Sequence, residues 1–342
     1  MRTRRSVAIG AAAVIVIGAA SAIAVVVHSL GQRHAGATGA LIVAGSLDPP
    51  THHLMPSTPG AASPSATATP APLPRPRASV RPAPRPTAST TPAPPSTQWH
   101  YTANGNFNAS GAYAPGTVGF NLADASSVAE VNSLPAGDEA LVFVGLCIAA
   151  ADPAFTSSFI AAVQPYLGNP RVFGFYLMDE PDPQTCPPAN LAAESDWIHA
   201  NFRGARTFIV MMNVQSPDSP SYAGTYTPQN SHVDLAGIDP YPVRTGLATP
   251  AYVDIPRCVA AAEAAGWPKS SLVPVFQAFG GGNWGGTWTL PTPAQEQHIL
   301  TTWTSLLPAP EFDYAYSWGP QNGDTSLSLS PALQAVFAAH NA

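Results

Sequence analysis

Apolar residues gather in seven continuous runs between residue 117 and the C-terminus, separated by longer helix-like segments. The runs lie at 118–123, 140–146, 172–178, 207–213, 233–239, 272–279 and 312–318. Continuous runs, unlike alternating ones, are typical of strands buried on both faces of a parallel sheet. Between or after the runs, the apolar spacing predicts helices at 126–134, 154–167, 189–202, 253–265, 293–307 and 331–340.

The order of these elements predicts an α/β fold, a (β/α)8 barrel of the TIM type. Strands that alternate with helices indicate βα units. Seven such units in roughly 225 residues approach the ~250 residues typical of that barrel. The pattern leaves one strand open, because residues 98–107 either supply the eighth strand or plug the barrel floor. The alternative is an open doubly wound sheet, but no glycine-rich phosphate-binding motif follows the first strand, so we favour the barrel.

Residues 1–35 have the features of a single-pass signal anchor. Residues 7–27 carry no charge and are long enough, at about 1.5 Å per residue, to cross a bilayer core of about 30 Å. Arginines within the first five residues keep the N-terminus in the cytoplasm. The alternative is a cleaved signal peptide, with the small residues at 19–22 as its cleavage site. We therefore expect either a membrane protein with an extracellular C-terminal domain or a secreted protein.

Residues 36–97 are rich in Pro, Ala, Ser and Thr and have almost nothing apolar to bury, so we expect a disordered, semi-rigid linker. Residues 98–342 then form the barrel domain. Up to residue 97 the chain has eight basic residues and one acidic residue, whereas the barrel domain has six basic and 19 acidic residues. A domain with a formal charge of −13 binds polyanions poorly, so nucleic acid is not an expected partner.

Three cysteines and nine histidines bear on disulfides and metals. Cys147 and Cys186 both follow strands that are predicted to be neighbours, and an exported protein can form disulfides, so we expect this pair to be bonded. Cys258 lies in a predicted helix and is expected to pack there as a small apolar side chain. The chain has no C-x-x-C and no H-E-x-x-H motif, and its histidines are scattered, so the sequence predicts no metal and no cofactor.

Nearly every predicted strand ends in a carboxylate, an amide or an aromatic residue, and active sites of such barrels lie at these strand ends. The candidates are Asp124, Asp179, Glu180, Asn213, Asp239, Tyr241, Gln277 and Trp318. Each residue alone also has a structural interpretation, as a helix cap, a turn former or a core residue. A whole rim of them favours a site, because buried polar groups are costly without a purpose or a partner.

The stretch F-G-F-Y-L-M-D-E-P-D at 173–182 concentrates this chemistry. Residues two apart on a strand share a face, so Glu180 is expected to point to the barrel centre with Met178 and Tyr176, while Asp179 turns aside. Burial and acidic neighbours are expected to raise the pKa of Glu180. A glutamic acid that stays protonated near neutral pH can protonate the leaving oxygen of a glycosidic bond. The alternative is an acidic loop that caps the following helix.

The run Y-L-M-D-E-P resembles the fourth-strand motif of retaining (β/α)8 glycoside hydrolases, the clan of cellulases, mannanases and β-galactosidases. In that clan an Asn-Glu-Pro tripeptide supplies the acid/base glutamate, which implies this role for Glu180. G-I-D-P-Y-P, which contains Tyr241, resembles the D-x-Y-P strand end of several of these families. Y-A-Y-S-W-G resembles their eighth strand, which implies that Trp318 stacks on a sugar. The resemblance covers roughly residues 117–342.

Two positions depart from the pattern of the clan. Asp179 stands where the clan has an asparagine that hydrogen-bonds the sugar 2-hydroxyl, and Gln277 stands at the position of the nucleophile glutamate. An amide cannot form the glycosyl ester, so three interpretations stay open. Asp239 activates water in an inverting enzyme, or Asp179 and Glu180 act as a pair on an N-acetyl sugar whose acetamide is the nucleophile. In the third interpretation the barrel is catalytically inactive and only binds glycan.

Trp284 and Trp288 lie in the glycine-rich loop G-G-G-N-W-G-G-T-W-T, with little to pack against. Tryptophan faces suit the apolar face of a pyranose, so both are expected to line a sugar-binding groove, unless they fold back over the barrel mouth. The sequence thus predicts an extracellular protein that cleaves or binds a polysaccharide or cell-wall glycan, with Glu180 as acid and Asp239 as second carboxylate. Substrate contacts are expected from Asp179, Asn213, Tyr241, Gln277, Trp284, Trp288 and Trp318.

Overall fold

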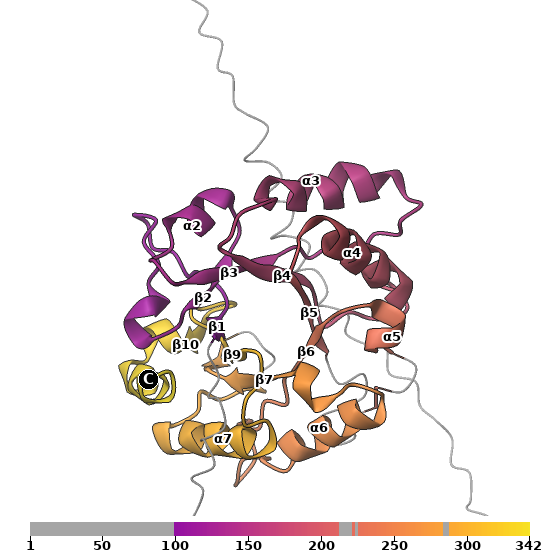
Figure 1. The fold of residues 1–342 in the computed structure, drawn as a ribbon. Helices are drawn as coiled ribbons and strands as arrows, with labels where there is room; N and C mark the ends of the chain where they lie inside the picture. The colour runs from indigo at the N-terminus through magenta and orange to yellow at the C-terminus, as the bar shows by residue number, and fades with distance from the viewer. Residues whose placement is uncertain (1–98, 212–220, 223–224, 283–286) are drawn as a thin grey trace, which may run out of the picture. The chain divides into compact units, whose positions relative to one another are not determined.

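Eight parallel strands close into a barrel in the computed structural model of the chain (Figure 1). The structure describes residues 99–211, 221–222, 225–282 and 287–342. The barrel strands follow one another in sequence order, and the last pairs with the first. They are β1 (His100–Thr102), β2 (Leu122–Ala125), β3 (Glu139–Phe143), β4 (Val172–Asp179), β5 (Arg206–Met211), β6 (Leu235–Ile238), β7 (Leu272–Gln277) and β9 (Asp313–Tyr316). Closure confirms the predicted TIM-type barrel and excludes the open sheet.

β1 is the eighth barrel strand, which the apolar pattern of the sequence did not assign. Its residues are buried, and it pairs with β2 on one side and with β9 on the other, so residues 98–107 supply the eighth strand. The prediction of a strand at 118–123 was wrong in position. A short 3-10 turn, η1 (Pro115–Val118), and Gly119 with a left-handed φ of 85° precede β2, which begins only at Leu122. Glycine adopts this φ without steric cost, so the chain turns before it enters the strand.

Helices surround the barrel (Figure 1). They are α2 (Val128–Ser133), α3 (Ala161–Val163), α4 (Pro188–Asn201), α5 (Pro228–Ser231), α6 (Asp254–Ala264), α7 (Pro293–Leu306) and α8 (Pro331–His340). Shorter 3-10 or π turns are η2 (Phe155–Ile160), η3 (Gln164–Tyr166), η4 (Lys269–Ser271) and η5 (Leu327–Leu329). The helix predicted at 154–167 is η2, α3 and η3 in succession, and the pattern did not predict α5. Helices α4, α5, α7 and α8 begin with proline, whose fixed φ and missing N–H suit the first turn.

Apolar side chains form one layer inside the barrel and another between the strands and the helices. Inside, aromatic rings dominate: the ring centroid of Phe208 lies 4.9 Å from that of Phe312, and Tyr101 lies 4.7 Å from Tyr314. Outside, strand residues such as Phe175 belong to the same buried cluster as side chains from the surrounding helices. The barrel is therefore a packed core, and an active site has room only at its ends.

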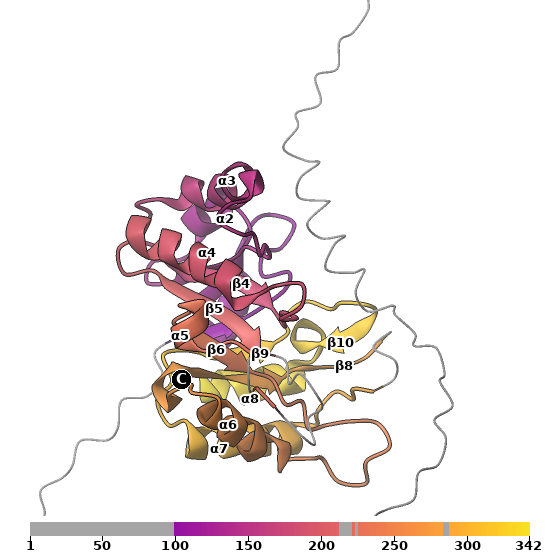
Figure 2. The same ribbon diagram turned by 90° about the vertical axis from the view of Figure 1, so that its right-hand side faces the viewer.

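A second, two-stranded antiparallel sheet consists of β8 (Phe279–Gly281) and β10 (Asp324–Ser326) (Figure 2). β8 follows directly after β7, and β10 follows β9 along the chain, so the small sheet extends the barrel beyond the C-terminal ends of these two strands. This is the end at which active sites of the fold lie.

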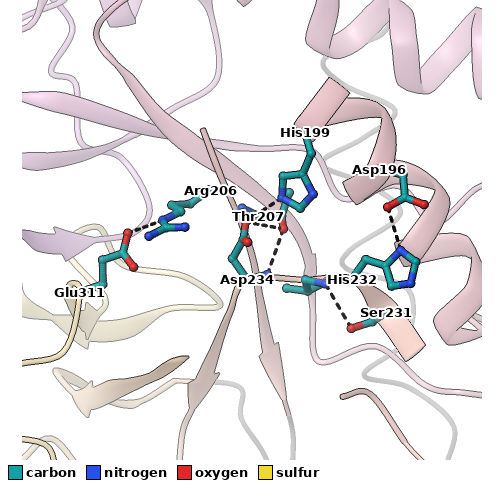
Figure 3. A network of polar contacts seen from close by, with 9 residues as sticks. Asp196, His199, Arg206, Thr207, Ser231, His232, Asp234 and Glu311 are labelled. Carbon is teal, nitrogen blue, oxygen red and sulfur yellow. Dashed lines mark hydrogen bonds and ion pairs between the residues drawn. The ribbon is translucent and has the colours of Figure 1, made fainter. Parts of the chain in front are cut away.

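Polar contacts hold β5 and β6 together at the opposite, N-terminal end of the barrel (Figure 3). The Asp234 carboxylate accepts hydrogen bonds from the backbone N–H and the hydroxyl of Thr207, at 2.8 and 3.1 Å, and lies 2.8 Å from Nε2 of His199. Next to Thr207, Arg206 forms an ion pair with Glu311, which precedes β9. These contacts fix where the two strands begin.

The expected disulfide is confirmed: Cys147 and Cys186, which are 39 positions apart in the sequence, are bonded, with their Cα atoms 5.6 Å apart. The bond ties the segment after β3 to the segment after β4. Cys258 is free and buried in α6. Within the described residues, no helix combines the length and the apolar composition that a bilayer crossing requires. The anchor expected at residues 7–27 and the expected linker lie outside the described residues.

Candidate active site

Asp239 faces into the barrel because side chains alternate along β6. Leu235 belongs to the interior cluster, and a Cβ atom on Gly237 would come within 2.9 Å of Phe208 and Val210, which also lie inside. Residues two apart share a face, so Asp239, directly after the strand, points to the same side. The absence of a side chain at Gly237 leaves space for the packed rings below it.

A register shift in β4 turns Asp179 into the barrel. The shift lies between Tyr176 and Met178 in the pairing with β5. Tyr176 packs in the barrel interior, whereas Met178 packs against the outer cluster. The Tyr176 hydroxyl donates a hydrogen bond of 2.5 Å to Asp179. The expectation that Met178 points inward and Asp179 turns aside was therefore wrong, because strict alternation does not continue through a bulge.

Glu180 follows the strand with a left-handed φ of 42°. Its backbone N–H donates to the carbonyl oxygen of Val210 at 3.0 Å, which keeps the residue tied to β5. Its carboxylate accepts a hydrogen bond from the carboxyl of Asp239. A positive φ costs a non-glycine residue on the order of 1–3 kcal/mol and occurs mainly where the surroundings impose it, often at functional sites. The contact with Asp239 brings the two predicted catalytic carboxyls together.

Burial raises the pKa of all three carboxyls at this end of the barrel. The pKa of Glu180 rises to about 7, through burial and then through the Asp179 carboxylate, while the hydrogen bond from Asp239 opposes the rise. Burial and then the charge of Glu180 raise the pKa of Asp239 well above its usual range. Burial also raises the pKa of Asp179, although this residue keeps an exposed surface and water weakens the effect. The Asp239–Glu180 pair therefore holds a proton near neutral pH.

Three tyrosines lie in the barrel interior beneath these carboxyls. The ring of Tyr314 lies 4.7 Å from Tyr101 and 6.4 Å from Tyr176, both in edge-to-face geometry. Burial raises the pKa of each hydroxyl, and nearby carboxylates, Asp179 among them, raise it further. The three hydroxyls therefore stay neutral, so they can orient groups by hydrogen bonding but do not act as bases.

An aromatic cluster lines one side of the site. The ring centroid of Tyr241 lies 5.0 Å from Phe279, 5.6 Å from Trp288 and 6.1 Å from Tyr316. Burial and then the charge of Asp239 raise the pKa of Tyr241, which places this ring beside the carboxyl pair. Tyr241 and Trp288 are half-buried, so both keep surface that a flat, partly apolar ligand can contact.

Gln277 holds two loops together at the mouth of the barrel. Its Oε1 accepts from the backbone N–H of Val243 at 2.8 Å, and its Nε2 donates to the carbonyl oxygens of Val243 at 2.9 Å and of Thr289 at 3.0 Å. The side chain is 0% exposed. This burial does not fit the expected contact with a sugar, because the amide already has its partners within the protein.

Of three further candidates, the structure describes only Trp318. Trp318 is 7% exposed and packs edge-to-face on Phe120, at 6.5 Å between ring centroids, so its burial does not fit a sugar-stacking role. Asn213 and Trp284 lie outside the described residues.

Two other acidic residues hold loops at this end of the barrel. Asp124 accepts a hydrogen bond from the backbone N–H of Asn104 at 2.8 Å. Asp182 accepts from the backbone N–H of Gln184 at 2.9 Å through its side chain, and from the N–H of Cys186 at 2.7 Å through its carbonyl oxygen. The acidic residues of the D-E-P-D stretch therefore have different roles: Asp179 and Glu180 belong to the carboxyl site, whereas Asp182 shapes the turn that leads to Cys186.

Sequence reasoning missed Tyr222, which lies beside the carboxyl pair. Burial raises its pKa, and Cys258, Asp239 and Glu180 raise it further. The Tyr222 hydroxyl donates a hydrogen bond to the thiol of Cys258, whose pKa burial raises to about 12. The only signal in the sequence was a loop rich in Ser, Pro and Tyr, which does not tell which tyrosine turns inward.

Fold and site together define a (β/α)8 barrel with a proton-sharing carboxyl pair at its C-terminal mouth. No family model matches the sequence, and no curated protein sequence matches it. Among solved structures, the chain is similar to the class V chitinase from Nicotiana tobaccum, with 13% identity and a TM-score of 0.48 over 72% of this chain and 99% of that one.

Two further solved structures are similar to the chain. The chitinase from Chromobacterium violaceum has 11% identity and a TM-score of 0.46, over 72% of this chain and 99% of that one. A fungal endo-β-N-acetylglucosaminidase of glycosyl hydrolase family 18 has 15% identity and a TM-score of 0.40, over 60% of this chain and 72% of that one. Similarities this distant carry no argument about function, and the strand pairing itself defines the barrel.

Proposed function

We propose that the chain is a glycoside hydrolase that cleaves a polysaccharide containing N-acetyl sugars, with Glu180 as the general acid. The observation that carries this proposal is the hydrogen bond between the Asp239 and Glu180 carboxyls at the mouth of the barrel. A half-buried pair that holds a proton near neutral pH can deliver it to the leaving oxygen of a glycosidic bond.

Two observations argue against the two-carboxylate schemes. Inverting enzymes need about 6.5–9.5 Å between their carboxyls to admit a water molecule, whereas the carboxyls of Glu180 and Asp239 share a hydrogen bond. Retaining enzymes need a carboxylate nucleophile. At the position where the clan that the sequence resembles has this nucleophile, Gln277 is a buried amide engaged with backbone groups. The remaining catalytic scheme uses the acetamide of the substrate as the nucleophile.

In this scheme each carboxyl has a separate task. The proton of the pair lies on Asp239, and it passes to Glu180 when a glycosidic oxygen approaches. Glu180 then protonates that oxygen. Asp239, now ionised, accepts the N–H of the acetamide and so increases the electron density on its carbonyl oxygen. That oxygen attacks the anomeric carbon as the bond to the protonated glycosidic oxygen breaks, and water, which gives a proton to the ionised Glu180, then opens the cyclic intermediate. Asp179, held by the Tyr176 hydroxyl, adds negative potential that favours the developing positive charge of the sugar ring.

The half-buried rings beside the pair suit a sugar ligand. Tyr241 and Trp288 keep exposed surface, and aromatic faces pack on the apolar C–H face of a pyranose. In the proposal these two residues form the sugar platform. Gln277 and Trp318 support the mouth from within and do not contact substrate.

We propose that the barrel acts outside the membrane, held by residues 1–35 through the linker 36–97. The Cys147–Cys186 disulfide supports this location, because disulfides persist mainly in exported proteins. Protease treatment of intact cells is the test. Loss of the barrel from the cell surface after protease treatment is the expected result. Barrel domain in the medium of untreated cells indicates a cleaved signal, and full protection of the barrel inside the cell contradicts the proposal.

The activity is tested with the full-length protein on oligosaccharides with and without N-acetyl sugars, such as chitin, cellulose and mannan fragments. The wild type is expected to cleave only the N-acetylated substrates. Glu180→Gln is expected to lower kcat on them by about 10²–10⁴-fold, the usual contribution of a general acid. Glu263→Gln is the matched control, because this glutamate is exposed on α6 and its ion pair with Lys269, at 3.7 Å, lies on the surface.

Three outcomes contradict the proposal in whole or in part. Full activity of Glu180→Gln removes the acid assignment. Binding of glycans without cleavage, in the wild type and on every substrate tested, supports the catalytically inactive glycan-binding barrel instead. Cleavage of cellulose or mannan fragments by the wild type leaves Glu180 as the acid but contradicts the role of the acetamide.

A further inference from the structure

Two histidines flank one buried carboxylate at the N-terminal end of the barrel, at the opposite end from Glu180. His100 opens β1, Asp313 opens β9, and His340 ends α8. Nδ1 of His100 lies 2.9 Å from Oδ1 of Asp313, and Nε2 of His340 lies 2.9 Å from Oδ2. Asp313 is 2% exposed and His100 is 7% exposed. The residues are 213 and 27 positions apart in the sequence, so no metal motif in the sequence could reveal them.

The cluster has the donor atoms and the spacing of a three-ligand metal site. Nδ1 of His100, a carboxylate oxygen of Asp313 and Nε2 of His340 all lie within 4.8 Å of one another. Zn²⁺ binds such ligands at about 2.0–2.2 Å, so ligand atoms around a tetrahedral ion stand roughly 3.3 Å apart. The carboxylate oxygens of Asp313 already lie near that separation from both histidines. The two imidazole nitrogens must also come to this separation from each other, and His340 can move to allow it, because it ends its helix and its side chain is 21% exposed.

A cavity of about 200 Å³ adjoins the cluster. His100, Asp313 and His340 line it together with apolar side chains that include Phe276 and Trp303. A metal ion with three protein ligands keeps one position for water or another small oxygen ligand, and the cavity offers room for it.

We propose that His100, Asp313 and His340 bind one divalent transition-metal ion, such as Zn²⁺. Two imidazoles and one carboxylate suit Zn²⁺, Co²⁺ and Fe²⁺, whereas Ca²⁺ and Mg²⁺ take oxygen ligands. The ion joins the first barrel strand, the last barrel strand and the last helix, at the point where β1 pairs with β9. Because this end of the barrel serves stability rather than catalysis, the ion stabilises the closed barrel and takes no part in the reaction.

The protein provides its own control for adventitious binding. His199 lies 2.8 Å from Asp234, and His232 lies 2.7 Å from Asp196, in two further His–Asp pairs (Figure 3). Within the described residues, only the His100 cluster brings three such ligands together. The pair of His232 is exposed, so replacing this histidine removes an imidazole of the same type without touching the barrel closure.

The test uses the full-length protein after removal of metal with EDTA. Calorimetric titration with Zn²⁺ is expected to give one bound ion per chain. At a free Zn²⁺ concentration of about 100 times Kd, the melting temperature is expected to rise by about 5–10 °C. Co²⁺ is expected to give the visible absorption of a four-coordinate ion. His340→Gln should lose saturable Zn²⁺ binding and the thermal shift, whereas His232→Gln should keep both.

The variant is interpretable only if it is folded, so circular dichroism accompanies each titration. His100→Gln serves as a second loss-of-ligand variant if His340→Gln does not fold. Absence of saturable Zn²⁺ and Co²⁺ binding in the folded wild type overturns the proposal and leaves a network of hydrogen bonds. Equal Zn²⁺ binding in wild type and in the folded His340→Gln or His100→Gln variant also overturns it.

Discussion

Replacing Gln277 with glutamate tests whether this side chain supports the barrel mouth or belongs to the chemistry. Its side chain is fully buried, and its Nε2 donates to the carbonyl oxygens of Val243 and Thr289, at 2.9 and 3.0 Å. An ionised glutamate offers no donor, so the carbonyl oxygen of Thr289 loses this partner, that of Val243 keeps only the backbone N–H of Thr289, at 3.1 Å, and both face a negative charge. A polar group left without its partner costs about 1–3 kcal/mol, and the buried carboxylate adds a cost of at least this size, so the free energy of unfolding is expected to fall by about 2–6 kcal/mol.

This loss corresponds to a drop in melting temperature of about 8–16 °C for the middle of that range. Thermal unfolding followed by circular dichroism gives the measurement. Gln321→Glu is the matched control, because Gln321 is half-buried and its Oε1 accepts from the Tyr316 hydroxyl at 2.8 Å, a role that a carboxylate keeps. The control is expected to stay within about 0.5 kcal/mol of wild type.

Gln277→Glu also places a carboxylate at the position of the nucleophile in the clan that the sequence resembles, yet we expect no gain in hydrolysis. A Gln277→Glu variant that melts like wild type, or that acquires cleavage of glycans without acetamido groups, refutes the reasoning that this residue only holds loops.

Three further predictions concern the disulfide and the buried acids. Removing the bond between Cys147 and Cys186, which spans 39 positions, is expected to cost about 4 kcal/mol by loop entropy, measured by denaturant unfolding of the double serine variant. Asp179→Asn removes a charge that raises the pKa of both Glu180 and Asp239, so the alkaline limb of the kcat/KM profile, which marks the loss of the proton that the pair holds, should move to lower pH. Burial raises the pKa of Glu194 to about 8, so the free energy of unfolding should fall as pH rises from about 4.5 to about 8, by up to ~1.4 kcal/mol per pH unit. Glu194→Gln should weaken this pH dependence, as measured by unfolding curves recorded across that range.

The sign of the Glu194 prediction follows from proton counting. The folded state keeps the proton on Glu194 between the unfolded and the folded pKa, whereas the unfolded state has lost it. The unfolded state therefore gains relative stability as pH rises through this window. Glutamine keeps the acceptor for the backbone N–H of Ile148, which lies 2.9 Å from Oε1, without an ionisation to suppress.

The apolar runs of the sequence predicted most of the barrel, because buried parallel strands need continuous apolar residues. β1 does not follow this pattern, so its position was not predicted. It has only three residues, two of them polar, His100 and Thr102, and its burial comes from pairing with β2 and β9. A strand held by neighbours that are distant in sequence leaves no periodic signal of its own.

The sequence predicted two carboxyls that the structure brings together, since Glu180 follows one predicted strand and Asp239 ends another. It did not predict which side chains face the barrel centre. The bulge at Tyr176 turns Asp179 inward, and a bulge depends on the pairing with β5. The sequence also did not predict that Gln277 binds the protein backbone and not a substrate, because the partners of its amide lie in two loops, at Val243 and Thr289.

The proposed acid role of Glu180 is tested most directly by the leaving group of the substrate. A sugar leaving group needs a proton, whereas dinitrophenolate departs without one. We predict that Glu180→Gln loses about 10²–10⁴-fold in kcat on an N-acetylated oligosaccharide but keeps most of its activity on the corresponding dinitrophenyl glycoside. An equal loss on both substrates, or no loss on the oligosaccharide, contradicts the role of Glu180 as the proton donor.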